Sequence, residues 1–263
     1  MKKDNFEFKK KYGQNFIQDD YIFDKIVDSS DLTENDLVIE IGPGDGGLTK
    51  KLSKKVKQVI SFEIDTTLKD KLDKIKEANV EINYIDFMKV NLDEYIKDYN
   101  SVKVVANLPY YITTPIINKL IEYYEKIDKI VIMVQKEVGQ RITASPNSKD
   151  YNSFTLFLRY YYNSKLALFV GKEKFFPVPK VDSVVVVMDK DTYVSTSVHN
   201  KDAYFKLIKD SFLHKRKNLK NNLTAYDLDK VNSILEKYNL DITRRAEEIS
   251  LDCFIELSNE NIM

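Results

Sequence analysis

One stretch decides the fold: Leu37-Val38-Ile39-Glu40-Ile41-Gly42-Pro43-Gly44-Asp45-Gly46-Gly47-Leu48-Thr49. Residues 37–41 predict a buried parallel strand, and residues 48–56 predict a helix. Between them, Gly42, Gly44 and Gly47 have the spacing G-x-G-x-x-G. Glycines in such a loop let the backbone turn tightly and approach a ligand closely. The stretch therefore predicts an α/β fold with a ligand site, although the pattern alone also fits dinucleotide-binding proteins.

The next two predicted strands each end at an acidic residue. Residues 58–62 are followed by Glu63, at the distance from Gly42 where a ribose diol is held in such folds. Residues 80–85 are followed by Asp86, which could accept a hydrogen bond from the adenine amine of a bound cofactor. The alternative is that both acids are helix N-caps or solvated loop residues, as many acids at such positions are.

A fourth predicted strand, residues 102–106, runs into Asn107-Leu108-Pro109-Tyr110. The amide oxygen of Asn107 and the carbonyl of Leu108 can both accept hydrogen bonds from one exocyclic amine. Pro109 restricts the backbone between these acceptors, and Tyr110 offers a face on which a planar base can stack. This combination suits methylation of an adenine amine. The alternative is a strand-to-turn junction with a buried tyrosine.

Taken together, the glycine loop, Glu63, Asp86 and Asn107 close four successive strands at their carboxyl ends. Open α/β sheets bind ligands at that edge. The coincidence indicates S-adenosyl-L-methionine as cofactor and direct transfer of its methyl group. A competing hypothesis, an NAD-linked oxidoreductase with the same glycine loop, leaves the motif of residues 107–110 unexplained.

Four ordered motifs resemble the KsgA/RsmA family of ribosomal RNA adenine dimethyltransferases. They are Gly13-Gln14-Asn15-Phe16, Ile41-Gly42-Pro43-Gly44-Asp45-Gly46, residues 107–115, and Phe175-Phe176-Pro177-Val178-Pro179-Lys180-Val181-Asp182-Ser183. The resemblance implies a Rossmann-like, doubly wound methyltransferase sheet. It also implies dimethylation of two adjacent adenosines near the 3′ end of 16S rRNA, in the immature small ribosomal subunit.

The resemblance also assigns roles to individual residues. Asn15 and Ile17 match cofactor contacts of the family, beside Gly42, Gly44, Glu63, Asp86 and Asn107. Phe175 matches the first residue of a Phe-x-Pro-x-Pro motif and would lie near the face of the target base opposite Tyr110. The catalytic set implied is thus Asn107, Leu108, Tyr110 and Phe175. Residues 211–219 resemble part of the family's small, all-helical C-terminal domain.

Two related hypotheses remain. The Erm group, which methylates 23S rRNA and confers macrolide resistance, shares the fold and most motifs. Gly13, Pro43, Asp45, Pro115 and Asp182 stand where Erm proteins usually carry other residues, and they favour KsgA. Tyr111 departs from the asparagine that many KsgA proteins have. A noncatalytic ribosome-assembly factor that retains the fold is the second alternative.

Composition excludes several classes of protein. The chain of 263 residues has one cysteine, Cys253, and two histidines, His199 and His214, so we expect no disulfide framework and no metal site. Residues 1–7 lack the apolar core of a secretory signal, and no apolar run approaches the ~20 residues of a membrane span. We therefore expect a cytoplasmic protein without membrane association that works as a monomer.

Basic residues cluster in two places although the net charge is zero. Residues 201–223 contain seven Lys or Arg against two Asp, and residues 1–14 contain five Lys against two acids. Such patches can bind RNA phosphates. The RNA-binding candidates are Lys215, Arg216, Lys217 and Lys220. The alternative for either patch is a solvated helix face.

The pattern predicts two domains. Residues 1–188 would form the methyltransferase domain with a basic N-terminal arm, and residues 189–263 a helical RNA-binding or accessory domain. Helices are expected at 113–126 and 151–162. The expected strands, the last two of them antiparallel, are 37–41, 58–62, 80–85, 102–106, 129–134, 166–170 and 184–187.

Overall fold

The computed structural model describes residues 15–260 and 262, so the basic segment 1–14 lies outside the described residues. Contacts divide the chain into two compact units. The first comprises residues up to 139 together with 165–190, and the second comprises 140–164 and 191–263. The second unit is therefore discontinuous in sequence, because residues 165–190 of the first unit lie between its two segments. The domain boundary expected between residues 188 and 189 stays a prediction.

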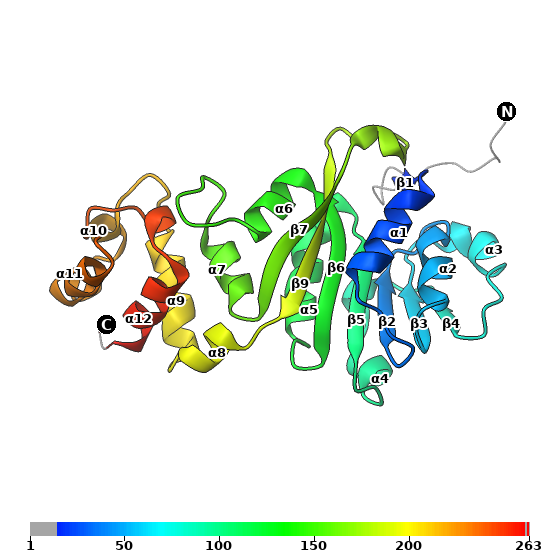
Figure 1. Cartoon of the computed structure of the whole chain (residues 1–263), viewed down its shortest axis with the longest axis horizontal. Coiled ribbons are helices and arrows are strands. Elements are labelled where there is room, and N and C mark those ends of the chain that lie inside the picture. Colours follow the sequence, from blue (N-terminus) through cyan, green and yellow to red (C-terminus); the bar gives the residue numbers. More distant parts are fainter. Residues whose placement is uncertain (1–14, 261, 263) are drawn as a thin grey trace. The chain divides into compact units, whose positions relative to one another are not determined.

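The first unit is built on a seven-stranded mixed sheet with the order β4-β3-β2-β5-β6-β9-β7 (Figure 1). Successive strands lie on both sides of β2, which pairs in parallel with β3 and β5, so the expected doubly wound α/β fold is confirmed. Strand β6 continues the parallel part, and β9 pairs with β6 antiparallel. The strands are β2 Leu37–Ile41, β3 Gln58–Phe62, β4 Val80–Asn83, β5 Val102–Asn107, β6 Ile127–Gln135, β7 Tyr162–Val170 and β9 Ser183–Lys190.

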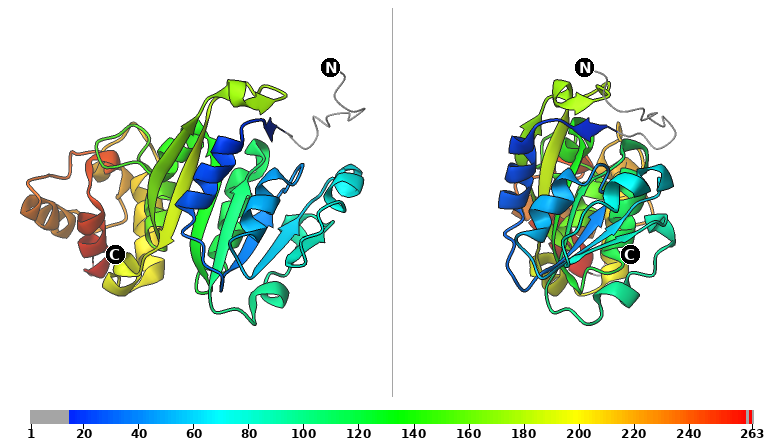
Figure 2. Two further views of the ribbon diagram at one scale, coloured as in Figure 1. Left: turned by 45° about the vertical axis from the view of Figure 1, so that its right-hand side comes forward. Right: turned by 90° about the vertical axis from the view of Figure 1, so that its right-hand side faces the viewer.

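One face of this sheet is covered by α1 (Asp20–Ser29) and α2 (Gly47–Ser53), which lie side by side against it (Figure 2). Helix α1 begins at Asp19, whose side chain accepts a hydrogen bond from the backbone N–H of Tyr21. Its buried residues recur at helical spacing and therefore form one apolar face. That face belongs to a core cluster that includes Val38, Val59, Val105, Val131 and Val185 from the strands.

The carboxyl ends of the strands lead into short helices and turns. A two-stranded antiparallel sheet near these ends pairs β1 (Phe16–Ile17) with β8 (Phe175–Phe176). The remaining helical elements of this unit are η2 Thr66–Leu68, α3 Lys69–Leu72, η3 Phe87–Lys89, α4 Asp93–Ile96, η4 Tyr110–Ile112, α5 Thr113–Ile121, α6 Lys136–Ile142, which runs into the second unit, and η5 Lys172–Lys174.

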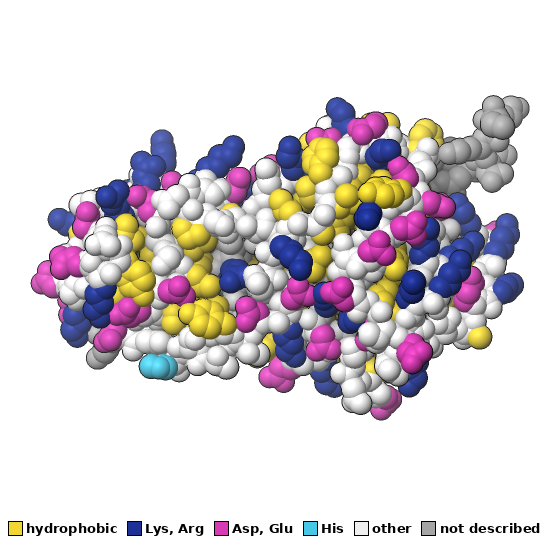
Figure 3. Space-filling view, viewed as in Figure 1, with side chains coloured by type: hydrophobic (Ala, Val, Ile, Leu, Met, Phe, Trp, Pro, Cys, Tyr) yellow, Lys and Arg dark blue, Asp and Glu magenta, His cyan; other side chains and the backbone are white. Residues whose placement is uncertain are grey.

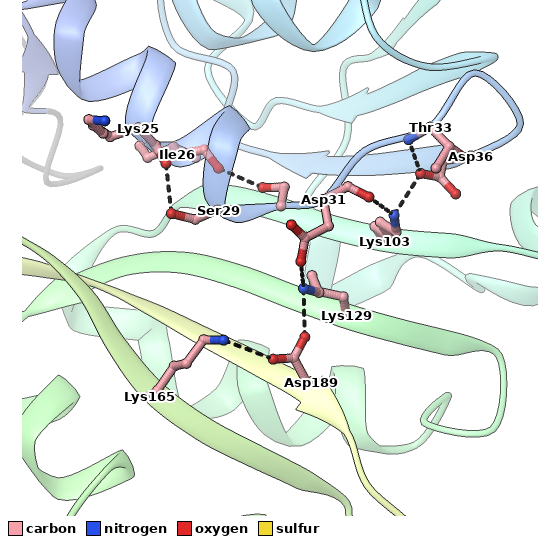
Figure 4. A network of polar contacts seen from close by, with 11 residues as sticks. Lys25, Ile26, Ser29, Asp31, Thr33, Asp36, Lys103, Lys129, Lys165 and Asp189 are labelled. Carbon is pink, nitrogen blue, oxygen red and sulfur yellow. Dashed lines mark hydrogen bonds and ion pairs between the residues drawn. The ribbon is translucent and has the colours of Figure 1, made fainter.

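Two strand lysines near the opposite edge of the sheet are buried in ion pairs (Figure 4). Lys103 lies 2.7 Å from Asp36 and also donates to the backbone carbonyl of Asp31. Lys129 pairs with the Asp31 carboxylate and lies 2.6 Å from Asp189. Because an unpaired buried charge is costly, this network fixes the loop after α1 to strands β5, β6 and β9. The network lies away from the carboxyl ends of the parallel strands, where the ligand site is expected.

The second unit is predominantly helical. Its helix α7 (Ser153–Arg159) is capped by Asn152 in a capping box with Thr155, so the helix expected over 151–162 is shorter and gives way to β7 at Tyr162. From residue 191 to residue 260 the elements are all helical, as expected. They are α8 Tyr193–Ser197, α9 Lys201–Ser211, α10 Leu219–Asn222, α11 Leu228–Lys237, η6 Ala246–Glu248 and α12 Leu251–Asn259.

Candidate active site

A cavity of about 410 Å³ opens at the carboxyl ends of β2, β3 and β5 in the first unit, beside the turn that follows β4. This volume is in the range of small-molecule sites in proteins. All the residues expected to bind the cofactor line this cavity. Three of the four residues expected to be catalytic line it too, because Asn107 has both roles. Together these residues are Asn15, Ile17, Gly42, Gly44, Glu63, Asp86, Asn107, Leu108 and Tyr110.

The glycine loop follows β2 directly and lines the cavity. Gly42 has φ +71° and Gly44 has φ +60°, conformations that other residues adopt only with strain. A Cβ on Gly44 would also lie 3.2 Å from the ring of Phe16, so that ring would have to shift by a few tenths of an ångström. The backbone N–H of Gly44 donates to Glu63 over 3.3 Å. The glycines therefore allow the loop to lie beside the acid that ends the next strand.

Glu63 is buried, with 5% of its surface exposed, and its two carboxylate oxygens accept from Gly44 N–H and, over 2.8 Å, from Asp65 N–H. Burial raises the pKa of Glu63, while these two backbone hydrogen bonds oppose the shift. The bond to Gly44 is long, so the oxygen that accepts it has capacity for a stronger donor. A ribose hydroxyl in the cavity could supply that donor.

Asp86 caps the short helix η3, because its carboxylate accepts from the backbone N–H of Met88 over 3.0 Å. The capping role that the sequence left as an alternative is therefore present. Asp86 nevertheless lines the cavity together with Phe87 and Met88. Capping uses one carboxylate oxygen, and the same side chain can present the other to a ligand.

Asn107 is the last residue of β5, and its side-chain NH₂ donates to the carbonyl of Asn15 over 3.3 Å. This contact uses the nitrogen of the side-chain amide and so fixes its orientation. The amide oxygen can then accept a hydrogen bond from a ligand. The backbone N–H of Leu108 donates to Met133 on the neighbouring strand over 3.1 Å and holds the next peptide in place. Pro109, with φ −60°, then begins the turn η4.

The ring of Tyr110 lines the cavity while its hydroxyl lies 2.6 Å from the hydroxyl of Ser183, the first residue of β9. Burial raises the pKa of Tyr110, so the phenol stays protonated at neutral pH. The contact fixes the position of the ring edge. A base that entered the cavity would therefore meet a ring held in place by the first residue of β9.

Phe175 is the one expected catalytic residue that does not line the cavity. Its side chain is 2% exposed and packs in the core cluster with α1 and the strands. It stands opposite Ile17 in the β1–β8 pair, and Ile17 does line the cavity. Its expected position beside the target base is therefore not what the structure shows, and its role stays a prediction.

Sequence reasoning overlooked Glu40, a carboxylate in the middle of β2. Its Oε2 accepts from the hydroxyls of Thr49 and Ser61 at 2.7 Å each, whereas Oε1 has no hydrogen-bond partner within the described part of the chain. The pKa of Glu40 is raised to about 7, chiefly by burial and to a smaller extent by the nearby Glu63 and Asp45, while the two hydroxyl hydrogen bonds oppose the shift. Glu40 also lines the cavity. The sequence signal that could have identified Glu40 is its position as an acid inside an apolar strand, just before the glycine loop.

The RNA-binding candidates lie in the second unit. Lys215, Arg216 and Lys217 are exposed in the turn between α9 and α10, and Lys220 is exposed on α10. Lys201, Lys206 and Lys209 of the same basic patch lie on helix α9, whereas three of the four candidates lie in this turn. The turn forms because the side chain of Asn222 bonds the backbone of Ser211 and His214. In the space-filling view, Lys and Arg side chains project from the upper edge near α10 (Figure 3).

Comparison with known proteins agrees with this geometry. The family described as "Ribosomal RNA adenine dimethylase" matches residues 5–262. Proteins named ribosomal RNA small subunit methyltransferase A are similar. That of Clostridium botulinum (strain Okra / Type B1) is 38% identical over 98% of this chain and 96% of its own, and that of Clostridioides difficile (strain 630) is 41% identical over 98% and 92%.

Two solved structures share the fold with a TM-score of 0.76. One is a dimethyladenosine transferase from Plasmodium falciparum, 25% identical, covering 92% of this chain and 95% of its own. The other is the 23S rRNA methyltransferase ErmE, 22% identical, covering 93% and 98%. The higher identity to the small-subunit enzymes means that the Erm-like alternative is not favoured. The chain is a methyltransferase that belongs to the ribosomal RNA adenine dimethylase family.

Proposed function

We propose that this protein transfers methyl groups from S-adenosyl-L-methionine to the N6 amines of two adjacent adenosines near the 3′ end of 16S rRNA, in the immature small ribosomal subunit. One observation carries the proposal. The glycine loop, Glu63, Asp86 and Asn107 come from four successive strand ends and line a single cavity. The named relatives, small-subunit methyltransferases, support the choice of RNA.

The cavity fits the proposed cofactor. S-adenosyl-L-methionine is a cation with an adenosine at one end, and its sulfonium makes the methyl group electrophilic. Glu63 is placed to accept from the ribose hydroxyls, and Asp86 to accept from the adenine amine. Glu63 and the buried Glu40 place two acidic side chains around this end of the cavity, which favours a cationic ligand.

Asn107 and Leu108 would act on the target amine. The nitrogen lone pair of adenine is delocalised into the ring, which makes the amine a poor nucleophile. If the Asn107 amide oxygen and the Leu108 carbonyl accept its two N–H groups, the nitrogen becomes more pyramidal and its lone pair points at the methyl group. These interactions strengthen as the reaction proceeds and therefore favour the transition state. No dedicated base is required, because the ammonium product is acidic enough to lose its proton to water.

Tyr110 would stack on the adenine after the base has left its helix. Its ring lies at the cavity and its hydroxyl is held by Ser183. Phe175 would contribute from the other side only if its ring reached the cavity from its buried position. The family's Phe-x-Pro-x-Pro motif supports this contact between Phe175 and the target base.

The exposed basic turn, with Lys215, Arg216, Lys217 and Lys220, would bind rRNA phosphates. We further propose that the protein works as a monomer in the cytoplasm, where its ribosomal substrate is assembled. Among the described residues, no helix combines the length and the apolar character needed to cross a membrane.

The decisive experiment maps N6-dimethylated adenosines on both ribosomal RNAs, in cells with and without this gene. We expect two adjacent dimethyladenosines near the 3′ end of 16S rRNA that disappear with the gene and return with the wild-type copy. If the two dimethyladenosines return with the wild-type copy but not with the Asn107→Ala copy, a purely structural assembly role is excluded. Loss of a 23S modification instead would overturn the proposal.

A further inference from the structure

Lys119 is a lysine in the buried face of a helix next to the cavity. Helix α5 buries Ile116, Ile117, Leu120 and Ile121, and Lys119 lies among them with only 9% of its surface exposed. This burial lowers the pKa of Lys119. An ammonium group in such a place destabilises the fold unless it is well hydrogen-bonded, so its partners are informative.

Those partners are backbone carbonyls in and next to the cavity wall. The Lys119 ammonium donates to Met88 over 3.0 Å and to Val90 over 2.6 Å. It also lies 5.4 Å from the centre of the Phe87 ring, within reach of a cation–π interaction. Phe87 and Met88 line the cavity directly. Charge-assisted hydrogen bonds are stronger than neutral ones, so this contact holds the wall firmly.

The wall needs such support because of its position in the sheet. Helix η3 is a single 3₁₀ turn that follows β4, the edge strand. Turns of this kind have few internal hydrogen bonds and are weak on their own. The other contacts of the turn include the Asp86 cap, hydrogen bonds from Lys89 N–H to the Asp86 carbonyl at 2.9 Å and from Val90 N–H to the Phe87 carbonyl at 3.1 Å, and the packing of the Phe87 ring on Phe62 at 5.6 Å between centroids. Lys119 adds the long-range contact that fixes the turn to α5.

Helix α5 also supports the opposite side of the cavity. It begins directly after η4, the turn that carries Tyr110, and its residue Ile116 lines the cavity together with Ile112. One helix therefore joins the turn expected to hold the target base to the turn expected to hold the cofactor adenine.

We propose that Lys119 is a positioning residue for the cofactor. Its ammonium holds the turn of Asp86, Phe87 and Met88 against α5, so that the adenine end of the site has its shape before the cofactor arrives. This inference rests on the proposed function of the cavity. Lys119 lies behind the wall and acts on the ligand through the Met88 and Val90 carbonyls.

The test is Lys119→Met, which keeps the length of the side chain and removes its charge, compared with Lys119→Arg and Lys119→Gln. The control is Lys126→Met, an exposed lysine shortly after α5 that pairs with Asp93 at 3.7 Å. Calorimetry with S-adenosylmethionine, S-adenosylhomocysteine and adenosine measures affinity, and methyl transfer to immature small subunits at saturating cofactor measures kcat.

We expect Lys119→Met to weaken all three ligands by about tenfold or more, the effect of losing a charge-assisted hydrogen bond. The kcat at saturating cofactor should change little, Lys119→Arg should recover much of the affinity, Lys119→Gln should be intermediate, and Lys126→Met should match the wild type. A merely structural role would lower the melting temperature without this split between KM and kcat.

Wild-type affinity in a folded Lys119→Met variant would overturn the inference. If that variant does not fold, wild-type affinity in Lys119→Gln would overturn it equally. Failure of the wild-type protein to bind S-adenosylmethionine would instead count against the proposed function of the cavity, so the two failures are distinguishable.

Discussion

Glu40 and Ser61 face each other in register on the adjacent parallel strands β2 and β3, and the Ser61 hydroxyl donates to Glu40 Oε2 over 2.7 Å. Thr49, on the helix after the glycine loop, donates to the same oxygen. One buried carboxylate thus joins two strands and a helix at the cavity wall. Its other oxygen lacks a partner in the described chain, and its pKa is raised to about 7.

This relationship predicts that cofactor affinity depends on pH. A cationic ligand favours the ionised form of Glu40 and lowers its pKa, so binding releases a proton when the pH is near or below 7. Affinity for S-adenosylmethionine should therefore rise as pH increases from 6 to 8 and level off above. Calorimetry in buffers of different ionisation enthalpy measures the released proton. Glu40→Gln should bind more weakly at pH 8 and show little change with pH; a wild-type profile in this variant would contradict the assignment.

Glu63 and Asp86 are predicted to bind the two ends of the adenosine. Each alanine substitution should weaken S-adenosylmethionine binding by about 1.5–3 kcal/mol, because a charge-assisted hydrogen bond in a desolvated site is lost. Calorimetry provides the measurement, with Glu81→Ala, an exposed acid on β4, as control.

Asp86→Asn separates capping from cofactor binding, because asparagine also caps helices while lacking the charge. It should keep the turn η3 intact and still bind the cofactor more weakly than the wild type. Unchanged affinity in both alanine variants would sink the assignment of these two acids.

Asn107 is predicted to act on the methyl-transfer step. Asn107→Ala should bind S-adenosylmethionine nearly as well as the wild type but lose most of the single-turnover rate, since its hydrogen bond to the amine strengthens as the nitrogen becomes pyramidal. Single-turnover methylation of immature small subunits measures this, with large-subunit RNA as control substrate. Near-normal transfer would refute the role.

Tyr110 is predicted to contribute its ring. Tyr110→Ala should lose stacking of about 1–3 kcal/mol with the target base. Tyr110→Phe should keep much of the activity, because it loses only the hydroxyl contact with Ser183. Ser183→Ala removes the same contact from the other side and should behave like Tyr110→Phe in the methylation assay. An inactive Tyr110→Phe beside an active Ser183→Ala would assign a direct role to the hydroxyl instead.

The basic turn is predicted to bind RNA and not the cofactor. Replacing Lys215, Arg216 and Lys217 with alanine should weaken rRNA binding and flatten its dependence on salt, because fewer counterions are released from phosphates. Cofactor affinity should stay the same. The matched control replaces three exposed lysines of the first unit, Lys54, Lys55 and Lys57. An unaltered salt slope in the turn variant would identify a merely solvated surface.

The positions of the seven main strands and the end of the sheet at which the site lies follow from the sequence, whereas the short β1–β8 pair was not expected. Strands β2 and β3 have the bounds that the apolar runs predicted, since burial on both faces of a parallel sheet leaves an unbroken local signal. The glycine loop, Glu63, Asp86 and Asn107 were found for a related reason. Each lies at or shortly after the carboxyl end of a strand, and the carboxyl ends of parallel strands share one edge.

Only the tertiary structure decided which side chains meet across long stretches of chain. It paired Tyr110 with Ser183, placed the ammonium of Lys119 on the Met88 and Val90 carbonyls, and left one oxygen of Glu40 without a partner in the described chain. It also buried Phe175, which the motif alone had placed beside the target base. These outcomes depend on strand order and on the packing of helices, and local periodicity carries no information about either.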